Sequence, residues 1–203
     1  MQFWTYLLSG LSLGISAAAS PGPYQAYVIG LALRSGWRRA LPAAFAPLVT
    51  DGPIIALVLL VLTQVPPTFL RLIQVAGGVF VLYLAWKTVL AYQQFQPDAV
   101  ISSRDTRRSL GQAVLMNFLS PGPYLFWSLM AGPTLLKGWG QSPLFGLAFL
   151  GGFYTALVGG TALLIVVFGL ARNLGPRVSR GMLALSAVAL LIFGAYQLWQ
   201  GLS

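Results

Sequence analysis

A single acidic residue lies within the long apolar segments of this chain. Asp51 is at the middle of the apolar stretch 40–62, whereas the other two acids, Asp98 and Asp105, lie in a polar stretch. A carboxylate at the centre of a bilayer costs about 2.5 to 3.5 kcal/mol on insertion scales, so it is a candidate for function by default. Asp51 can bind a substrate ammonium group, or it can take up a proton and couple transport to a proton gradient. Because removal from water favours the protonated form of a carboxyl group, the second role suits it. The structural alternative is a carboxyl group that only hydrogen-bonds Thr50 or a broken helix end.

The pentapeptide Ser-Pro-Gly-Pro-Tyr occurs twice, at Ser20–Tyr24 and at Ser120–Tyr124, each time near the middle of a long apolar run. Proline lacks an N–H group and clashes with the preceding turn, so each copy should interrupt its helix, and a new helix can begin at Pro23 and at Pro123. Two helix N-termini that face each other can hold a carboxylate, and the carbonyl ends of the preceding helices can hold an ammonium group or a coupling cation. Two structural kinks without a ligand are the alternative. The candidate substrate-binding residues are Ser20, Pro21, Gly22, Pro23, Tyr24, Asn117, Ser120, Pro121, Gly122, Pro123 and Tyr124.

Several of these side chains have a second interpretation. Asn117 could add an amide to the site or serve packing, and Tyr24 and Tyr124 could line or gate a cavity or simply fill space. Lys87 could pair with Asp51 or with a substrate carboxylate. Alternatively, the stem of Lys87 lies along apolar surface while its charged end reaches the membrane boundary.

The composition is that of an integral membrane protein. The chain has 203 residues, of which 57% are hydrophobic and only 7% are charged, against roughly 25% charged residues in soluble domains. The net charge of +9 comes from scattered residues between apolar runs and not from a patch for nucleic acid. The chain contains no Cys and no His, so we expect no disulfide, no metal and no cofactor. Without a nucleophile and base pair, we also expect no enzymatic activity.

Six apolar segments are long enough to cross a bilayer, which takes about 20 residues. We therefore predict an all-α membrane protein with two three-helix units, residues 1–94 and 110–203, joined by a polar connection at 95–109. The first and fourth spans contain the two pentapeptides and should be broken there. The predicted spans are 3–33, 40–62, 69–94, 110–136, 143–171 and 181–200.

The basic residues predict the orientation. Three alternate loops carry nine arginines, whereas the opposite side has only Arg71 and Lys137. By the positive-inside rule the three loops are cytoplasmic and both termini are outside. The nine residues are Arg34, Arg38, Arg39, Arg104, Arg107, Arg108, Arg172, Arg177 and Arg180.

The two halves resemble each other beyond the pentapeptide. Gly36-Trp37 follows the first copy and Gly138-Trp139 the second, and the ends of the third and sixth spans, 84–87 and 194–197, are similar. Because each half has an odd number of spans, the second half should be inverted, as in many secondary transporters. The region that matches Asp51, at 152–154, has no acid, so any site is asymmetric. Chance recurrence of a short motif is the alternative.

At these residues the sequence resembles the LysE/RhtB family of bacterial amino-acid exporters. Matching features are Pro-Gly-Pro in the first span, the turn GWRRA at 36–40, and a small-residue stretch that ends in Asp51. Family members often have Gly where this chain has Ala40, Ala46 and Thr50. In the second half the family usually reads Asn-x-x-Asn-Pro-Lys.

Here that second motif reads NFLSPG. Asn117 and Pro121 match it, but Ser120 and Gly122 do not, which places this chain in a divergent branch. The resemblance covers the whole chain and is strongest over 16–90.

The resemblance implies a secondary-active exporter in the bacterial cytoplasmic (inner) membrane, driven by the proton motive force. Its partners would be a small-molecule substrate, protons and the lipid bilayer, with no nucleic acid; association of several copies stays open. One acid is too few for a basic substrate, so we favour a neutral, even apolar, amino acid or derivative. A transporter of a monovalent cation with the same architecture is the alternative, and a purely structural or lipid-interacting subunit is a third reading.

Overall fold

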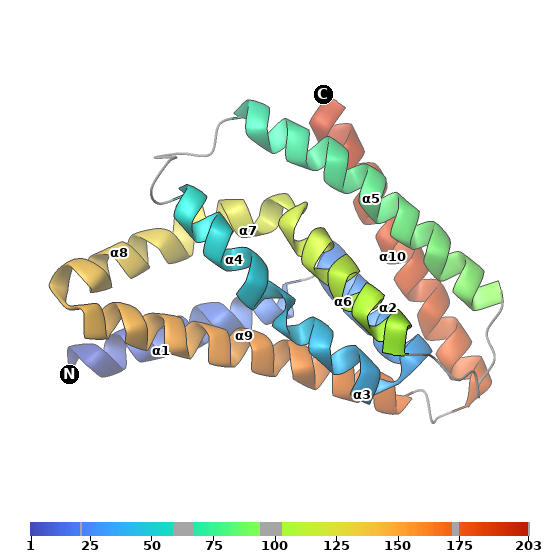
Figure 1. Cartoon of the computed structure of the whole chain (residues 1–203), viewed down its shortest axis with the longest axis horizontal. Coiled ribbons are helices and arrows are strands. Elements are labelled where there is room, and N and C mark those ends of the chain that lie inside the picture. Colours follow the sequence, from blue (N-terminus) through green and yellow to red (C-terminus); the bar gives the residue numbers. More distant parts are fainter. Residues whose placement is uncertain (21, 59–66, 94–102, 172–174, 203) are drawn as a thin grey trace.

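The protein is helical throughout the part of the chain that the structure, a computed structural model, describes: residues 1–20, 22–58, 67–93, 103–171 and 175–202. This agrees with the predicted all-α class. Figure 1 shows the helices as long rods around a central group of shorter ones. The elements are α1 (Gln2–Ala19), α2 (Pro23–Ser35), α3 (Trp37–Ala40), the 3-10 helix η1 (Leu41–Phe45), α4 (Ala46–Ala56), α5 (Pro67–Gln93), α6 (Ser103–Phe118), α7 (Pro121–Phe126), the π-helix η3 (Trp127–Ala131), α8 (Gly132–Gln141), α9 (Pro143–Ala171) and α10 (Pro176–Leu202).

Both copies of the pentapeptide interrupt a helix. In the first, α1 ends at Ala19 and α2 begins at Pro23, as predicted; Pro21 lies outside the described residues. In the second, α6 ends at Phe118 and the next helix begins at Pro121. The predicted start at Pro123 was two residues late, because Pro121 can itself occupy the first turn, where no N–H group is needed.

The long spans with prolines are divided further than we predicted. The described part of segment 40–62 contains η1 and α4, and α3 ends at its first residue, Ala40. Pro42 and Pro47 lie near the starts of η1 and α4, and Pro53 lies inside α4. Among the described residues, three helices are long and apolar enough to cross a membrane, at Arg71–Leu90, Pro143–Ala171 and Arg180–Leu202. These correspond to the third, fifth and sixth predicted spans. The three other spans are divided into shorter helices, and the six-span inverted repeat stays a prediction.

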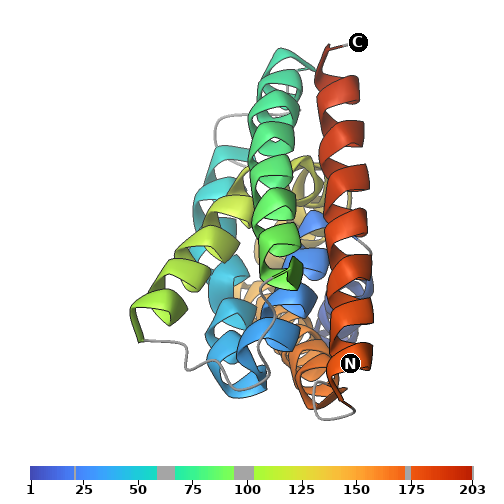
Figure 2. The ribbon, with the colours of Figure 1, turned by 90° about the vertical axis from the view of Figure 1, so that its right-hand side faces the viewer.

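Two long helix pairs enclose the centre. α1 lies along α9, and α5 lies along α10 (Figures 1 and 2). Glycine permits the close approach of α1 to α9. A methyl group added at Gly10 of α1 would collide with the backbone of α9, and one added at Gly152 of α9 would collide with the backbone of α1. α2 packs against both α9 and α10, while α4 packs against α6. Tyr24 after the first break and Asn117, Ser120 and Tyr124 at the second are buried, whereas Ser20 is exposed.

The outer surface is apolar. Large side chains on the four long helices face outward, including Leu8 of α1, Leu72 of α5, Leu163 of α9 and Leu185 of α10. Exposed apolar patches of this extent belong in contact with another apolar phase. Together with the three candidate spans, they identify a membrane protein.

Basic helix ends gather at one end of the molecule. The end of α2 with α3, the start of α6 and the start of α10 lie near one another, at the bottom of Figure 2, and both chain termini lie away from them in Figure 1. Gly36 makes the sharp turn from α2 to α3 with a φ of 77°, a backbone conformation that favours glycine.

Candidate functional site

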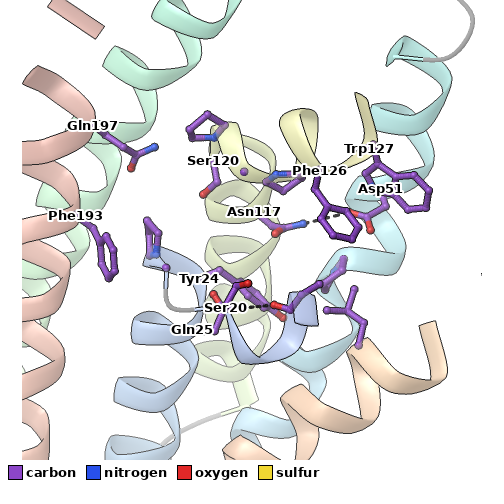
Figure 3. A pocket seen from close by; sticks show the side chains of 18 of the residues that line it. Ser20, Tyr24, Gln25, Asp51, Asn117, Ser120, Phe126, Trp127, Phe193 and Gln197 are labelled. Carbon is purple, nitrogen blue, oxygen red and sulfur yellow. Dashed lines mark hydrogen bonds between the residues drawn. The ribbon is translucent and has the colours of Figure 1, made fainter. Parts of the chain in front are cut away.

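A cavity of about 340 Å³ lies between the two helix breaks. Its volume falls within the ~300–1,000 Å³ of small-molecule sites. Both pentapeptides contribute to it, together with α4, α9 and α10 (Figure 3). The lining residues are Ala17, Ser20, Gly22, Pro23, Tyr24, Gln25, Pro47, Asp51, Asn117, Ser120, Pro121, Gly122, Pro123, Phe126, Trp127, Phe153, Leu157, Phe193, Tyr196, Gln197 and Gln200.

The two pentapeptide serines make the same local contact. The Ser20 hydroxyl donates to the carbonyl of Ser16 at 2.8 Å, and the Ser120 hydroxyl donates to that of Met116 at 2.7 Å. The Gln25 amide also donates to the Ala17 carbonyl at 3.2 Å. Side chains therefore already bind several of the carbonyl groups that terminate α1 and α6, which we had expected to be available for a ligand.

Asp51 is buried at one side of the cavity among neutral donors. Asn117 of α6 lies with its amide nitrogen 2.6 Å from the Thr50 hydroxyl and 3.5 Å from one carboxylate oxygen of Asp51. The Tyr154 hydroxyl of α9 donates to the other oxygen at 3.4 Å, and Trp127 of η3 adds a side-chain hydrogen bond. The Thr50 hydroxyl lies 3.5 Å from the carboxylate. Four elements of both halves thus meet at this one acid.

Two of the predicted residues, Tyr124 and Lys87, are not among the described residues that line the cavity. The Tyr124 hydroxyl donates to the Phe118 carbonyl at 2.9 Å, and its ring packs on Phe69. The Lys87 ammonium lies over the rings of Tyr83 and Trp86, at 5.8 and 5.2 Å from their centroids. Both rings are exposed, so the contact is on the outer surface. Pro21 is outside the described residues.

The other predicted residues are brought together around the cavity. They are Ser20, Gly22, Pro23, Tyr24, Asp51, Asn117, Ser120, Pro121, Gly122 and Pro123. The Tyr24 hydroxyl donates to the Ala43 carbonyl of η1 at 2.7 Å, so Tyr24 presents mainly its ring to the cavity.

The sequence reasoning missed the polar residues Gln25, Tyr154, Gln197 and Gln200. Tyr154 lies in the stretch of the second half that matches Asp51, at 152–154, where the sequence showed only that no acid is present. Gln197 occupies the position that the comparison of 84–87 with 194–197 aligns with Lys87. The internal repeat was therefore the signal that could have found both.

Aromatic and aliphatic side chains form much of the remaining wall, at Phe126, Trp127, Phe153, Leu157 and Phe193. Asp51 is the sole charged side chain among the described residues that line the cavity. Such a space can hold a small molecule that is apolar on one side and polar on the other.

Comparison with known proteins agrees with a membrane translocator. A family model described as LysE type translocator matches residues 15–201. The chain is also 26% identical over 204 residues to a protein of Bacillus subtilis (strain 168) named "Putative amino acid efflux protein YcgF", with 96% of each chain covered. No solved structure matches the chain. The matching family is one of translocators and not of enzymes.

Proposed function

Because this chain belongs to the family of LysE type translocators, we propose that it is a secondary-active exporter that moves amino acids or related small zwitterions out of the cytoplasm in exchange for protons. One observation carries the proposal: the cavity between the two helix breaks contains a buried carboxylate, Asp51, among neutral donors. The Bacillus subtilis relative, which is named for amino acid efflux, supports the choice of substrate class.

A neutral amino acid fits the cavity better than a basic one. The polar lining supplies one carboxylate and several amides and hydroxyls, while Phe126, Phe153 and Phe193 offer apolar surface. A positively charged side chain would need an acid of its own, and the described lining has none besides Asp51, which we assign to the proton below. We therefore propose a zwitterion with an uncharged, apolar side chain, such as L-leucine.

Asp51 is the proposed proton carrier. No Lys or Arg is among the described residues that line the cavity, so no fixed cation compensates an ionised Asp51. Binding and release of a proton is then the available way for this group to change its charge during transport. Its donors come from α4, α6, η3 and α9, so a relative movement of these helices would change its surroundings.

The proposed topology is two inverted three-helix units, 1–94 and 110–203, in the cytoplasmic membrane of a bacterium with both termini outside. The matching hydrogen bonds of Ser20 and Ser120 support a repeat. The grouping of the basic helix ends, away from the termini, supports the orientation. Substrate-binding roles for the residues at the two breaks belong to the same proposal.

The test is transport by the purified protein in liposomes. An imposed proton gradient should drive accumulation of radiolabelled L-leucine above that of protein-free liposomes, with L-lysine as the contrasting substrate. Parallel assays with labelled sodium and rubidium test the cation alternative. Cation flux without flux of any amino acid in a panel would contradict the proposal.

A further inference from the structure

The cavity contains one polar side chain whose hydrogen-bonding capacity is unused. Gln197 of α10 is 5% exposed, and neither its amide nitrogen nor its amide oxygen has a hydrogen-bond partner in the described part of the chain. Figure 3 shows this amide pointing from α10 toward Ser120 at the second helix break. Because both amide atoms lack a partner, the observation holds in either orientation of the amide group.

Close packing fixes where this amide lies. A methyl group added at Gly77 of α5 would lie 3.1 Å from the Gln197 amide nitrogen and would collide with the Leu119 carbonyl. The bare backbone at Gly77 therefore leaves room for the amide between α5 and the end of α6. A buried amide without partners is unfavourable, so a ligand that pairs with both amide atoms would relieve this unfavourable burial.

The neighbouring glutamine on the same helix differs. The amide of Gln200 donates to the Tyr196 hydroxyl at 2.6 Å and accepts from Gln74 at 3.2 Å. Gln25, on the first break, is bound to the Ala17 carbonyl. Of the three cavity glutamines, Gln197 is the one with both amide atoms available within the described structure.

Asp51 is already surrounded by donors. A carboxylate has about four acceptor positions, and four side chains approach this one. They are Asn117, Trp127, Tyr154 and Thr50. The single Thr50 hydroxyl proton is shared with the nearer carbonyl groups of Ala46 and Pro47, at 3.3 Å. A substrate ammonium group would have to compete with these donors at Asp51, whereas it would compete with no described group at Gln197.

We propose that Gln197 binds the head group of the transported amino acid, which leaves Asp51 to carry the proton. The amide NH₂ donates to the substrate carboxylate, and the amide oxygen accepts from the substrate ammonium group. This pairing requires both charged groups of an α-amino acid. The inference rests on the proposed export of amino acids and assigns the head group within that site.

The experiment compares the wild type with Gln197→Met, which keeps the side-chain length and removes the amide. The probe is L-leucine, measured by binding to the purified protein and by exchange in liposomes. We expect binding to weaken by roughly 10- to 100-fold. The melting temperature of the empty variant should be unchanged or higher, because no hydrogen bond within the described structure is lost.

A second comparison tests the pairing itself. For the wild type, 4-methylpentanoate and 3-methylbutylamine, which each lack one charged group of L-leucine, should both bind much more weakly than L-leucine. For Gln197→Met the three compounds should differ far less. Gln141→Met is the matched control, because Gln141 is an exposed residue at the end of α8.

The outcomes separate this inference from the function on which it rests. A wild type that neither binds nor exchanges any amino acid contradicts the proposed function and this inference with it. A wild type that binds L-leucine while Gln197→Met binds equally well overturns the role of Gln197 alone. A lower melting temperature with unchanged binding would show that the amide is structural, and would also overturn it.

Discussion

At the scale of single residues, the central feature is a carboxylate whose described hydrogen-bond donors are all neutral and belong to different helices. Asn117 comes from the second half of the chain and Thr50 from the first, and they meet at 2.6 Å beside Asp51. Such a network stabilises the carboxylate only while the helices keep their relative positions. We infer that the network links the charge state of Asp51 to the arrangement of the helices around the cavity.

Thr50→Val tests that network with little change in volume. The substitution removes the hydroxyl group that Asn117 contacts. The buried amide nitrogen of Asn117 then keeps only its long contact to Asp51, at 3.5 Å. We expect a loss of about 1 to 3 kcal/mol in the free energy of unfolding, measured by denaturation in detergent. Thr50→Ser keeps the hydroxyl group and should lose much less. Equal stability of both variants would mean that the contact is energetically unimportant.

The sequence identified some site residues and could not identify others, for a physical reason. Asp51 stood out because acids in apolar spans are costly and therefore rare. The aromatic residues Trp127 and Phe153 did not, because 13% of the chain is aromatic and most such residues pack in the core or face lipid. The internal repeat could have marked position 197, but that the Gln197 amide is buried without a partner can be recognised only when the positions of its neighbours are known.

At the scale of helices, close packing of α1 on α9 depends on which glycines face the other helix. Of two adjacent glycines in α9, Gly152 contacts the backbone of Leu7 and Leu11, whereas Gly151 has no neighbour within 4 Å of an added methyl group. The pair is therefore a matched test of this interface.

Gly152→Ala should lower the free energy of unfolding by about 1 to 3 kcal/mol, because the added methyl group forces the two helices apart. Gly151→Ala should be neutral or slightly stabilising, because alanine favours the helical conformation and meets no neighbour. Thermal denaturation in detergent measures both. A larger loss for Gly151→Ala than for Gly152→Ala would contradict the described packing.

Continuous apolar helices were predicted well, and interrupted ones only in part. The predicted spans 143–171 and 181–200 agree closely with α9 and α10, because length and hydropathy alone decide such segments. Segment 40–62 was predicted as one helix, although Pro42, Pro47 and Pro53 were visible in the sequence. Because proline is tolerated in the first turn of a helix, a proline in the sequence shows that a new helix can begin at that residue. It does not show whether the helix before it ends.

At the scale of the whole molecule, the proposed orientation can be tested directly, because the chain has no cysteine. Arg38→Cys places a thiol on an exposed residue of the basic end, and Gln141→Cys places one at the end of α8. On intact cells a membrane-impermeant maleimide should label Gln141→Cys only, and Arg38→Cys should react after permeabilisation. Arg38 is one of nine loop arginines, so the orientation should survive its loss. The reverse labelling pattern would contradict the orientation.

The central claim is that Asp51 carries the proton while the substrate binds elsewhere in the same cavity. The most direct measurement is transport by Asp51→Asn in liposomes, with whichever amino acid the wild type accumulates. We predict that the folded variant still exchanges labelled for unlabelled amino acid across the membrane but no longer accumulates it in response to an imposed proton gradient. Gradient-driven accumulation equal to that of the wild type would contradict the claim.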